Sequence, residues 1–284
     1  MDENPKCPHC DKARRKQFPT RKRGSYTTDD GTVRQRFECT SKHCGKTFTE
    51  AFVPADRGRR TDVDAMLFKL ACSGVTIRRS AKLLDVAVNT VRKRMAALAI
   101  RARAAHAAAA LDPKMLTATV QFDEMRTFLN SREQPLSIAL AVRRHNGHIL
   151  SAKVGTMSAS GLLAAAGRAK GWVGVNNAKA TRRLALTETK KFLRPNEAPT
   201  FICDGLSAYR REIRAVIGLN TAVESHVRDG DPHDPLFRLN HVCAKIRADL
   251  ACMARDTWTT TKKVECLQDR LDIYIAWNNV YEII

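Results

Sequence analysis

Hydrophobic residues in the second half of the chain recur with two different periods. Strand-like runs occupy 117–129 (TATVQFDEMRTFL), 137–155 (SIALAVRRHNGHILSAKVG, two strands turning at Asn146–Gly147) and 200–205 (TFICDG). Helical spacing occupies 158–170, 206–218 and 239–255, whereas the polar stretch 171–195 predicts no regular element. Asn-Gly between two such runs is a strong hairpin signal. This order of hairpin, helix, strand and helix predicts an α/β domain over residues 115–284 with an RNase H-like arrangement.

A helical period also governs residues 61–103. Thr61 is a candidate N-cap for a first helix that stops at Gly74, a second short helix follows in 76–86, and Asn89 is placed to cap a third. Two helices joined by a short turn, the second of them basic at its start, are typical of a helix-turn-helix that reads the DNA major groove. The residues expected to reach DNA are Thr90, Arg92, Lys93 and Arg94. The alternative is a three-helix bundle with solvated arginines.

The first 52 residues carry two pairs of closely spaced cysteines. CPHC supplies Cys7 and Cys10, and CTSKHC supplies Cys39 and Cys44. Four thiolates on two tight turns complete a tetrahedral zinc site, and a segment this small needs its metal to fold. With a basic stretch and the hairpin-like VRQRFEC between the pairs, this pattern predicts a zinc ribbon over 1–52 with structural Zn²⁺ and no catalytic zinc. The alternative is four scattered free thiols.

Charge strengthens the expectation of a nucleic-acid partner. The 284 residues include 49 Lys and Arg against 29 Asp and Glu, a net charge of +20. Residues 1–112 hold 24 of the basic and 12 of the acidic side chains, so the excess is densest there. A balance of this kind favours polyanion binding over a merely solvated surface. The chain has no run of about 20 apolar residues and no apolar leader segment, so we expect neither a membrane partner nor secretion.

Two strand-borne carboxylates are candidates for catalysis. Asp123 and Glu124 are adjacent in the first strand and must point to opposite faces, while Asp204 ends the later strand TFICD. Enzymes that cut and join DNA hold two Mg²⁺ ions roughly 3.5–4 Å apart with a few carboxylates, one from a central strand and one from an adjacent strand end. Asp123 and Asp204 fit these two positions, and Glu124 is expected to pair with a basic side chain on the other face.

Four of these features together resemble one family. The CPHC ribbon, the helix-turn-helix, the FDEM strand and the ICDGLSAYR segment are similar to transposases of the smallest bacterial insertion-sequence family, the first named in that nomenclature. The resemblance covers nearly the whole chain and implies a DDE-type, RNase H-like catalytic domain that cuts and joins DNA ends. It implies Asp123 and Asp204 as catalytic, Mg²⁺-binding residues, with Tyr209 in the following helix.

The third catalytic position departs from that family. Where the family has a Glu near the start of a helix, alignment on Arg247, Leu250 and Ala251 places Asn240. Asn offers a carbonyl oxygen but no charge, so Mg²⁺ would bind more weakly; related insertion-sequence groups do use a D-D-N set. Other candidates for the third ligand remain open, namely His226, Asp231, Asp234, His241, Asp249 and Glu265. Asp249 should face away from Asn240, because nine residues at about 100° each end half a turn round the helix.

The expected function is a DNA transposase acting in the bacterial cytoplasm at the nucleoid. Its partners would be double-stranded DNA, as element ends and target, and further copies of itself on that DNA. Lys262 and Lys263, in a TTTKK stretch that resembles a basic segment of the family, would contact phosphates. Competing functions are a DNA-binding repressor or inactive transposase derivative, and a resolvase or nuclease of the same fold.

Overall fold

The chain folds as two compact units, Met1–Arg57 and Gly58–Ile284. The computed structural model describes residues 4–12, 18–27, 33–49, 60–172, 174–226, 234–254 and 258–281. The segment 54–60 (PADRGRR) is polar and contains Pro and Gly, so the sequence predicts a linker there; apart from Arg60 it lies outside these residues. None of the described helices combines the length and apolar character needed to span a membrane.

The first unit is a small antiparallel sheet with one short helix. Strands β1 (Thr20–Thr27), β2 (Val33–Cys39) and β3 (Thr47–Thr49) pair in that order, and α1 (Pro8–Lys12) precedes them. Phe37 and the partly buried Phe48 stack at 5.9 Å between ring centroids, and the other buried apolar residues described in this unit are three cysteines. So little apolar surface cannot hold a domain of this size together without a further cross-link.

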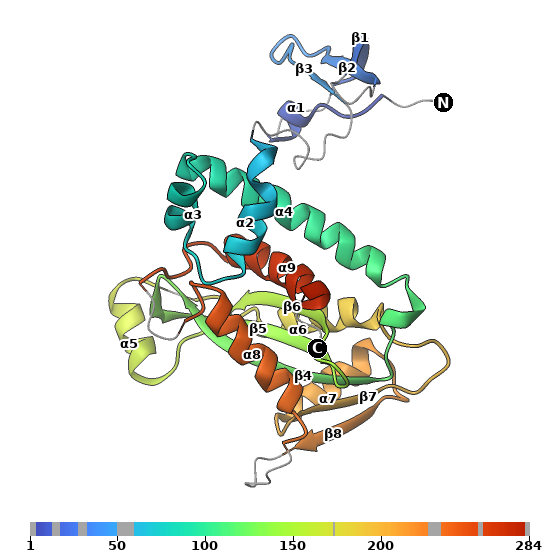
Figure 1. Cartoon of the computed structure of the whole chain (residues 1–284), viewed down its shortest axis with the longest axis vertical. Coiled ribbons are helices and arrows are strands. Elements are labelled where there is room, and N and C mark those ends of the chain that lie inside the picture. Colours follow the sequence, from blue (N-terminus) through green and yellow to red (C-terminus); the bar gives the residue numbers. More distant parts are fainter. Residues whose placement is uncertain are drawn as a thin grey trace. The chain divides into compact units, whose positions relative to one another are not determined.

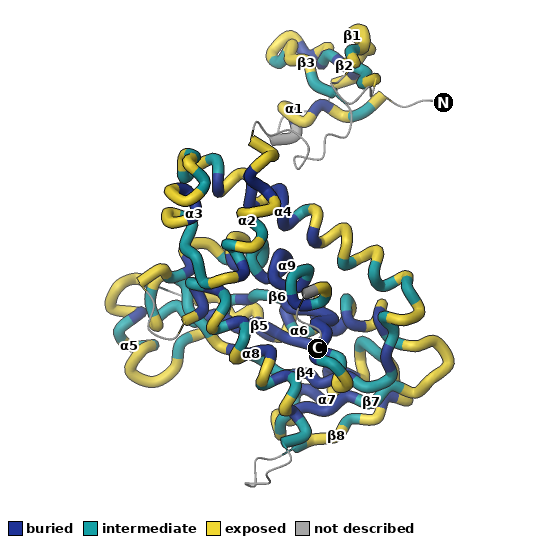
Figure 2. The backbone as a smooth tube through the Cα atoms, in the orientation of Figure 1, coloured by how far each residue is buried: buried dark blue, intermediate teal, exposed yellow. Residues whose placement is uncertain are grey.

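A five-stranded mixed sheet forms the centre of the second unit (Figure 1). Its order is β6-β5-β4-β7-β8, from β4 (Thr119–Leu129), β5 (Ser131–Arg143), β6 (Ile149–Thr156), β7 (Thr200–Asp204) and β8 (Ala222–His226). β4, β5 and β6 form the predicted antiparallel meander, and β7 and β8 run parallel to β4. β5 is buried from Leu136 to Val142 because helices cover both faces of the sheet (Figure 2).

Strand alternation divides the side chains between two hydrophobic cores. Val120 and Phe122 pack with α6 (Ala178–Lys190) and α7 (Ser207–Val216) on one face. Met125 and alternate residues of β5 pack on the other, with α8 (Phe237–Asp249) and α9 (Val264–Tyr281). This unit also contains α5 (Gly161–Ala169) and two short 3-10 turns, Thr61–Val63 and Pro113–Met115. Its remaining described helices lie at 64–109.

The helices expected at 61–103 are present as α2 (Asp64–Ala71), α3 (Ile77–Leu83) and α4 (Val88–Ala109). Their buried residues, including Leu67 and Val91, belong to the same core as α8, α9 and the sheet, so segments expected as separate domains share one core. The two helix N-caps expected at Thr61 and Asn89 are not found at these positions. The first helix follows a 3-10 turn that begins at Thr61, and α4 begins at Val88, so Asn89 lies inside it. Thr76 is an N-cap, whose hydroxyl accepts from the amide of Arg79 at 3.3 Å.

Candidate functional site

Asp123 and Asp204 lie side by side at the carboxyl end of the parallel strand pair. Phe122 of β4 is in register with Cys203 of β7, so the next residue along each strand is the aspartate. Burial and the charges of Asp204 and Asp123 raise the pKa of the Cys203 thiol to about 11. Both carboxylates are thus close enough to Cys203 to affect its ionisation, which agrees with their places on adjacent strands. Asp204 is fixed by the amide of Leu206, which donates to its Oδ1 at 3.0 Å.

Asp123 is held from two sides at one oxygen. Its Oδ1 accepts the hydroxyl of Tyr209 at 3.0 Å and the amide of Glu124 at 2.7 Å. Burial is the main reason that the pKa of Asp123 is raised, and repulsion from Asp204 adds to it, while the two hydrogen bonds act in the opposite direction. Two adjacent carboxylates at one edge of a sheet repel each other, and a divalent cation bound between them neutralises that repulsion.

Glu124 points to the opposite face of β4, as predicted, and meets a basic side chain there. Arg182 of α6 donates to its Oε2 at 2.9 Å, and Ser137 donates to its Oε1. Arg182 also makes a two-pronged ion pair with Glu212 of α7, at 2.6 and 2.8 Å. The prediction that Glu124 pairs with a cation is confirmed, so the two adjacent acids have separate environments.

Asn240, the candidate third ligand, lies near the start of α8. The side-chain amide of Asn240 donates to Oδ2 of Asp234 at 2.7 Å, which leaves its carbonyl oxygen for another ligand. Oδ1 of Asp234 lies 4.0 Å from Nε2 of His226, and His226 is in register with Asp204 across β7 and β8. Asn240, Asp234 and His226 therefore form a connected set that reaches the strand end carrying Asp204.

Gln121 fixes the start of α8 against the sheet. Its amide donates to the carbonyl of Pro235, and its oxygen accepts the amide of Leu239 at 2.8 Å. Gln121 and Asp123 are two residues apart on one strand and so share a face. In agreement, the charge of Asp123 contributes to the raised pKa of Cys243, one turn beyond Asn240, although burial is the larger cause.

Three more candidates for the third ligand have other environments. Asp249 accepts the hydroxyl of Tyr274 at 2.7 Å at the far end of α8, which agrees with its expected orientation away from the site. His241 is exposed and stacks on Phe237, and Glu265 is exposed on the first turn of α9. A fourth candidate, Asp231, lies outside the described residues.

The donor atoms at this edge suit magnesium. Carboxylate and amide oxygens are the hard ligands that Mg²⁺ takes, with water and substrate phosphates in its remaining positions. Asp123 and Asp204 supply two carboxylates at this edge, and the carbonyl oxygen of Asn240 is the neutral oxygen that α8 could add to them.

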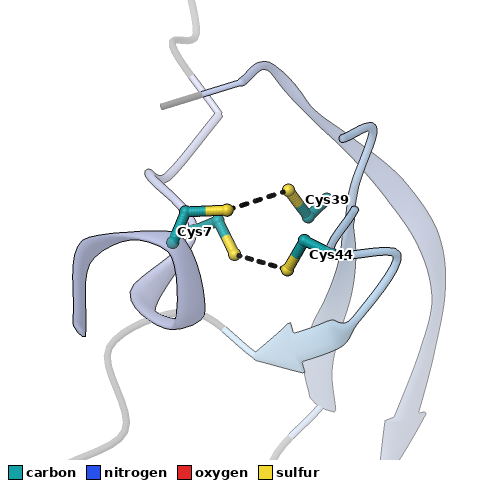
Figure 3. Close-up of side chains that lie close together, drawn as sticks. Cys7, Cys39 and Cys44 are labelled. Carbon is teal, nitrogen blue, oxygen red and sulfur yellow. Dashed lines mark hydrogen bonds between the residues drawn. The ribbon is translucent and has the colours of Figure 1, made fainter. Parts of the chain in front are cut away.

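The four cysteines of the first unit converge on one point (Figure 3). Their sulfurs lie within 4.8 Å of one another, with 3.8 Å between Cys7 and Cys44 and 3.7 Å between Cys10 and Cys39. Sulfurs bound tetrahedrally to zinc at about 2.3 Å are separated by about 3.8 Å. Among the described residues this is the one group of three or more Cys, His, Asp or Glu side chains so arranged, and its all-thiolate composition and spacing fit a closed Zn²⁺ site.

The expected DNA-reading residues of α4 do not share one surface. Arg92 and Lys93 are exposed and Thr90 is half-buried, whereas Arg94 is only 3% exposed. Nε of Arg94 donates to Oδ1 of Asp64 at 2.7 Å, and Arg101 binds the same carboxylate. This corrects the prediction for Arg94, whose guanidinium joins α4 to α2 inside the helical core because position 94 falls on the inward face of α4.

Lys262 and Lys263 are exposed in the segment that leads into α9. The neighbouring Thr261 accepts the amide of Asn130 at 2.8 Å and bridges Leu129, at the far end of β4. Leu129 is six residues beyond Asp123, or about 20 Å along an extended strand. The lysine pair therefore lies well away from the two aspartates.

Three polar residues around Asp123 were not identified from the sequence, namely Gln121, Arg182 and Glu212. Arg182 and Glu212 lie on α6 and α7, and the sequence alone does not show that these two helices pack beside each other. Arg182 also falls in a polar stretch for which the sequence predicts no regular element. A signal was present for α6, because its buried Ala178, Thr181, Ala185 and Thr189 recur at helical spacing.

Comparisons with known proteins give weak likenesses. No protein-family model matches the chain, and no curated protein matches it. Among solved structures, it is similar to the Mos1 strand transfer complex, with 14% identity, 80% of this chain and 77% of that chain covered, and a TM-score of 0.32. It is also similar to the catalytic domain of Mos1 mariner transposase, with 14% identity, coverage of 66% and 87%, and a TM-score of 0.30. At TM-scores near 0.3 these likenesses do not establish a shared fold.

Proposed function

We propose that this protein is a DNA transposase, which uses a metal-dependent phosphoryl-transfer site to cut and join DNA ends. The observation that carries the proposal is the pairing of Asp123 and Asp204 at the carboxyl end of adjacent parallel strands, with Asn240 on the helix fixed against β4 by Gln121. A hairpin followed by parallel strands, with an Asp on the first strand and another at a later strand end, is the order expected for an RNase H-like domain.

Each residue has a distinct task in this proposal. Asp123 and Asp204 hold Mg²⁺, and Asn240 supplies a neutral third oxygen. Magnesium, when bound, would activate the attacking oxygen and stabilise the leaving oxygen of the scissile phosphate. Tyr209 orients Asp123 through the hydroxyl that it donates to Oδ1.

The remaining modules would bring DNA to this site. The net charge of +20 favours a polyanionic partner. The zinc-stabilised hairpin and the exposed start of α4, with Arg92 and Lys93, would bind the terminal repeats. Lys262 and Lys263 would contact backbone phosphates, and joining two ends would require at least two copies of the protein.

The test is strand cleavage and joining on duplexes that carry the inverted repeats flanking the gene, with Mg²⁺ or Mn²⁺. We expect wild-type protein to join strands and Asp204→Ala protein to bind the same DNA without joining. Asp249→Ala is the matched control, because it removes a carboxylate at the other end of α8, and it should retain activity. Joining by Asp204→Ala protein would refute the assignment.

A repressor that binds DNA without cutting it is the second candidate. It is favoured by Asn240, which brings no charge and whose amide is engaged with Asp234 at 2.7 Å. The same assay separates the two functions, because a repressor would bind the repeats and leave them uncut with either metal.

A further inference from the structure

Arg182 occupies an unusual position behind the proposed metal site. Its guanidinium lies between Glu124 and Glu212, and the three side chains are 11%, 13% and 2% exposed. Removing charges from water is expensive, and a buried ion pair is weak grounds for expecting stability. Two buried carboxylates around one cation also leave an excess negative charge immediately behind Asp123.

Tyr209 connects this cluster to Asp123. Its hydroxyl oxygen lies 3.0 Å from Oδ1 of Asp123 and 3.4 Å from Oε2 of Glu124. A tyrosine hydroxyl has one proton to donate, so the two carboxylates compete for it. The guanidinium of Arg182 lies 5.9 Å from the centre of the tyrosine ring, which adds a cation–π contact to the same group.

Each carboxylate oxygen of Glu124 already accepts a hydrogen bond from a donor other than Tyr209. Arg182 donates to its Oε2 at 2.9 Å, and Ser137 donates to its Oε1. With these donors in place, Glu124 does not need the hydroxyl of Tyr209. The proton of Tyr209 is then directed to Asp123, in agreement with the shorter of the two distances.

We propose that Arg182 is a positioning residue for Asp123: by binding Glu124 it keeps the hydroxyl of Tyr209 on Oδ1 of Asp123. This inference rests on the proposed function, since it assumes that Asp123 is a metal ligand. Tyr209 and the amide of Glu124 both occupy Oδ1, and no hydrogen bond to Oδ2 is found among the described residues. The network therefore orients the carboxylate with Oδ2 directed to a cation. Without Arg182, Glu124 would draw the tyrosine hydroxyl away and Asp123 would lose this constraint.

The test measures Mn²⁺ binding to the full chain without DNA, by electron paramagnetic resonance of the free ion. Loss of a residue that orients a metal ligand typically weakens metal binding about 10- to 100-fold. We expect a weakening of this size in Arg182→Gln and a similar one in Tyr209→Phe. Arg103→Gln is the matched control, because Arg103 pairs with the buried Asp272 at 2.6 Å on another part of the unit, and it should bind Mn²⁺ like wild type.

Rescue separates positioning from a purely structural role. The double variant Arg182→Gln with Glu124→Gln removes the unpaired charge that would compete for Tyr209, so we expect Mn²⁺ affinity to recover to within about threefold of wild type. Loss of Mn²⁺ binding in Arg182→Gln without recovery in the double variant would overturn the proposal. If Arg182→Gln does not fold, the double variant and Tyr209→Phe decide it, since both must give the stated affinities.

The outcome for this inference can be distinguished from that for the proposed function. Normal Mn²⁺ binding by folded Arg182→Gln, with strand joining still abolished by Asp204→Ala, would overturn the positioning role alone. The expected Mn²⁺ affinities in a protein that leaves repeat DNA uncut would support the positioning role and refute the transposase.

Discussion

Two arginines two residues apart on α4 have different roles. Arg94 is buried against Asp64, where its hydrogen bonds and those of Arg101 outweigh the effect of burial and lower the pKa of that carboxylate. Arg92 is exposed at the start of the same helix. A positive residue near the start of a recognition helix is therefore not by itself a DNA contact, because the inward face of the helix uses the same residue type for an internal ion pair.

Substitution at these two positions should give opposite results. Removing one partner of a buried pair costs about 3–5 kcal/mol, so Arg94→Met should lower the free energy of unfolding by about 3 kcal/mol, since Arg101 still binds Asp64. Arg92→Ala should change it by less than about 0.5 kcal/mol but weaken DNA binding and reduce its salt dependence by about one phosphate contact. Urea unfolding and DNA titrations at several salt concentrations measure both. Unchanged stability of Arg94→Met would contradict the buried pair.

His148 should make the second unit sensitive to acid. It is 2% exposed, and neither ring nitrogen has a hydrogen-bond partner among the residues that the structure describes. Burial, with smaller contributions from His106 and Arg143, lowers its pKa to about 4, below the value of about 6.5 expected in the unfolded chain. The unfolded state therefore binds the proton more readily between these values, so the free energy of unfolding falls as the pH drops from about 6.5 to 4, by about 3 kcal/mol in total.

Urea unfolding of wild type and His148→Leu at pH 7 and pH 4.5 measures this contribution. Carboxylates such as Asp64 also lose their stabilising charge in acid, so the comparison of the two proteins isolates the histidine. The variant should lose less stability on acidification than wild type. Equal losses in both proteins would contradict an uncharged, buried His148.

At the scale of elements, one glutamine links the start of α8 to the sheet, in addition to the apolar residues by which the helix packs in the core. Gln121 is the side chain of β4 that binds both the loop before α8 and its first turn, and Asp123 follows on the same face. Asp123 and Asp204 are positioned by strand pairing, whereas Asn240 and Asp234 are positioned through this clamp. The strand pair and the helix can thus be perturbed separately.

Gln121→Leu should separate the helix from the strand pair. The variant leaves a buried amide and a carbonyl without their partner, which costs about 1–3 kcal/mol. It should reduce the rate of strand joining by more than the fall in Tm alone would explain. The reason is that the third ligand moves while Asp123 and Asp204 stay in place. Strand-joining rates and thermal melts of the variant measure this, with Gln268→Leu, which removes a similar strand-to-helix clamp from Val154 and Ala152, as the control. Equal effects of the two variants on joining would contradict a specific role for Gln121.

The elements differ in how far the sequence predicts them. The meander, β7 and α7 follow from alternation, the Asn146–Gly147 turn and strong helical spacing. α6 was missed because its buried face is mostly Ala and Thr, with Leu186 as the one large apolar residue among its buried positions. β8 was missed because it is short and partly exposed. Asp123, Asp204 and the four cysteines could be found because their chemistry is local to short motifs. Arg182, Glu212 and Gln121 could not, because each acts across a contact between distant segments.

At the scale of the whole molecule, the two compact units depend on different forces. The second unit has two extensive hydrophobic cores, whereas the buried apolar residues described in the first unit are Phe37 and three cysteines, with Cys44 and Phe48 packed against the cysteines. The first unit should therefore depend on zinc for its fold and the second should not.

Removal of zinc should unfold the first unit alone. With a strong chelator, or with Cys44→Ser, we expect loss of about one zinc per chain and loss of dispersed amide signals from β1 and β2, while the thermal transition of the second unit is unchanged. Atomic absorption and two-dimensional NMR give these readings. Cys266→Ser is the control, because Cys266 is exposed on α9. A first unit that stays folded without metal would contradict this prediction.

The central claim is that Asp123 and Asp204 together hold the divalent cation for phosphoryl transfer. The most direct measurement is anomalous scattering from a crystal of the full chain soaked with Mn²⁺. We predict a peak bound by a carboxylate oxygen of each aspartate, with Asn240 alongside, and no such peak in Asp204→Ala. Absence of the peak from wild type, or its persistence in the variant, would contradict the claim.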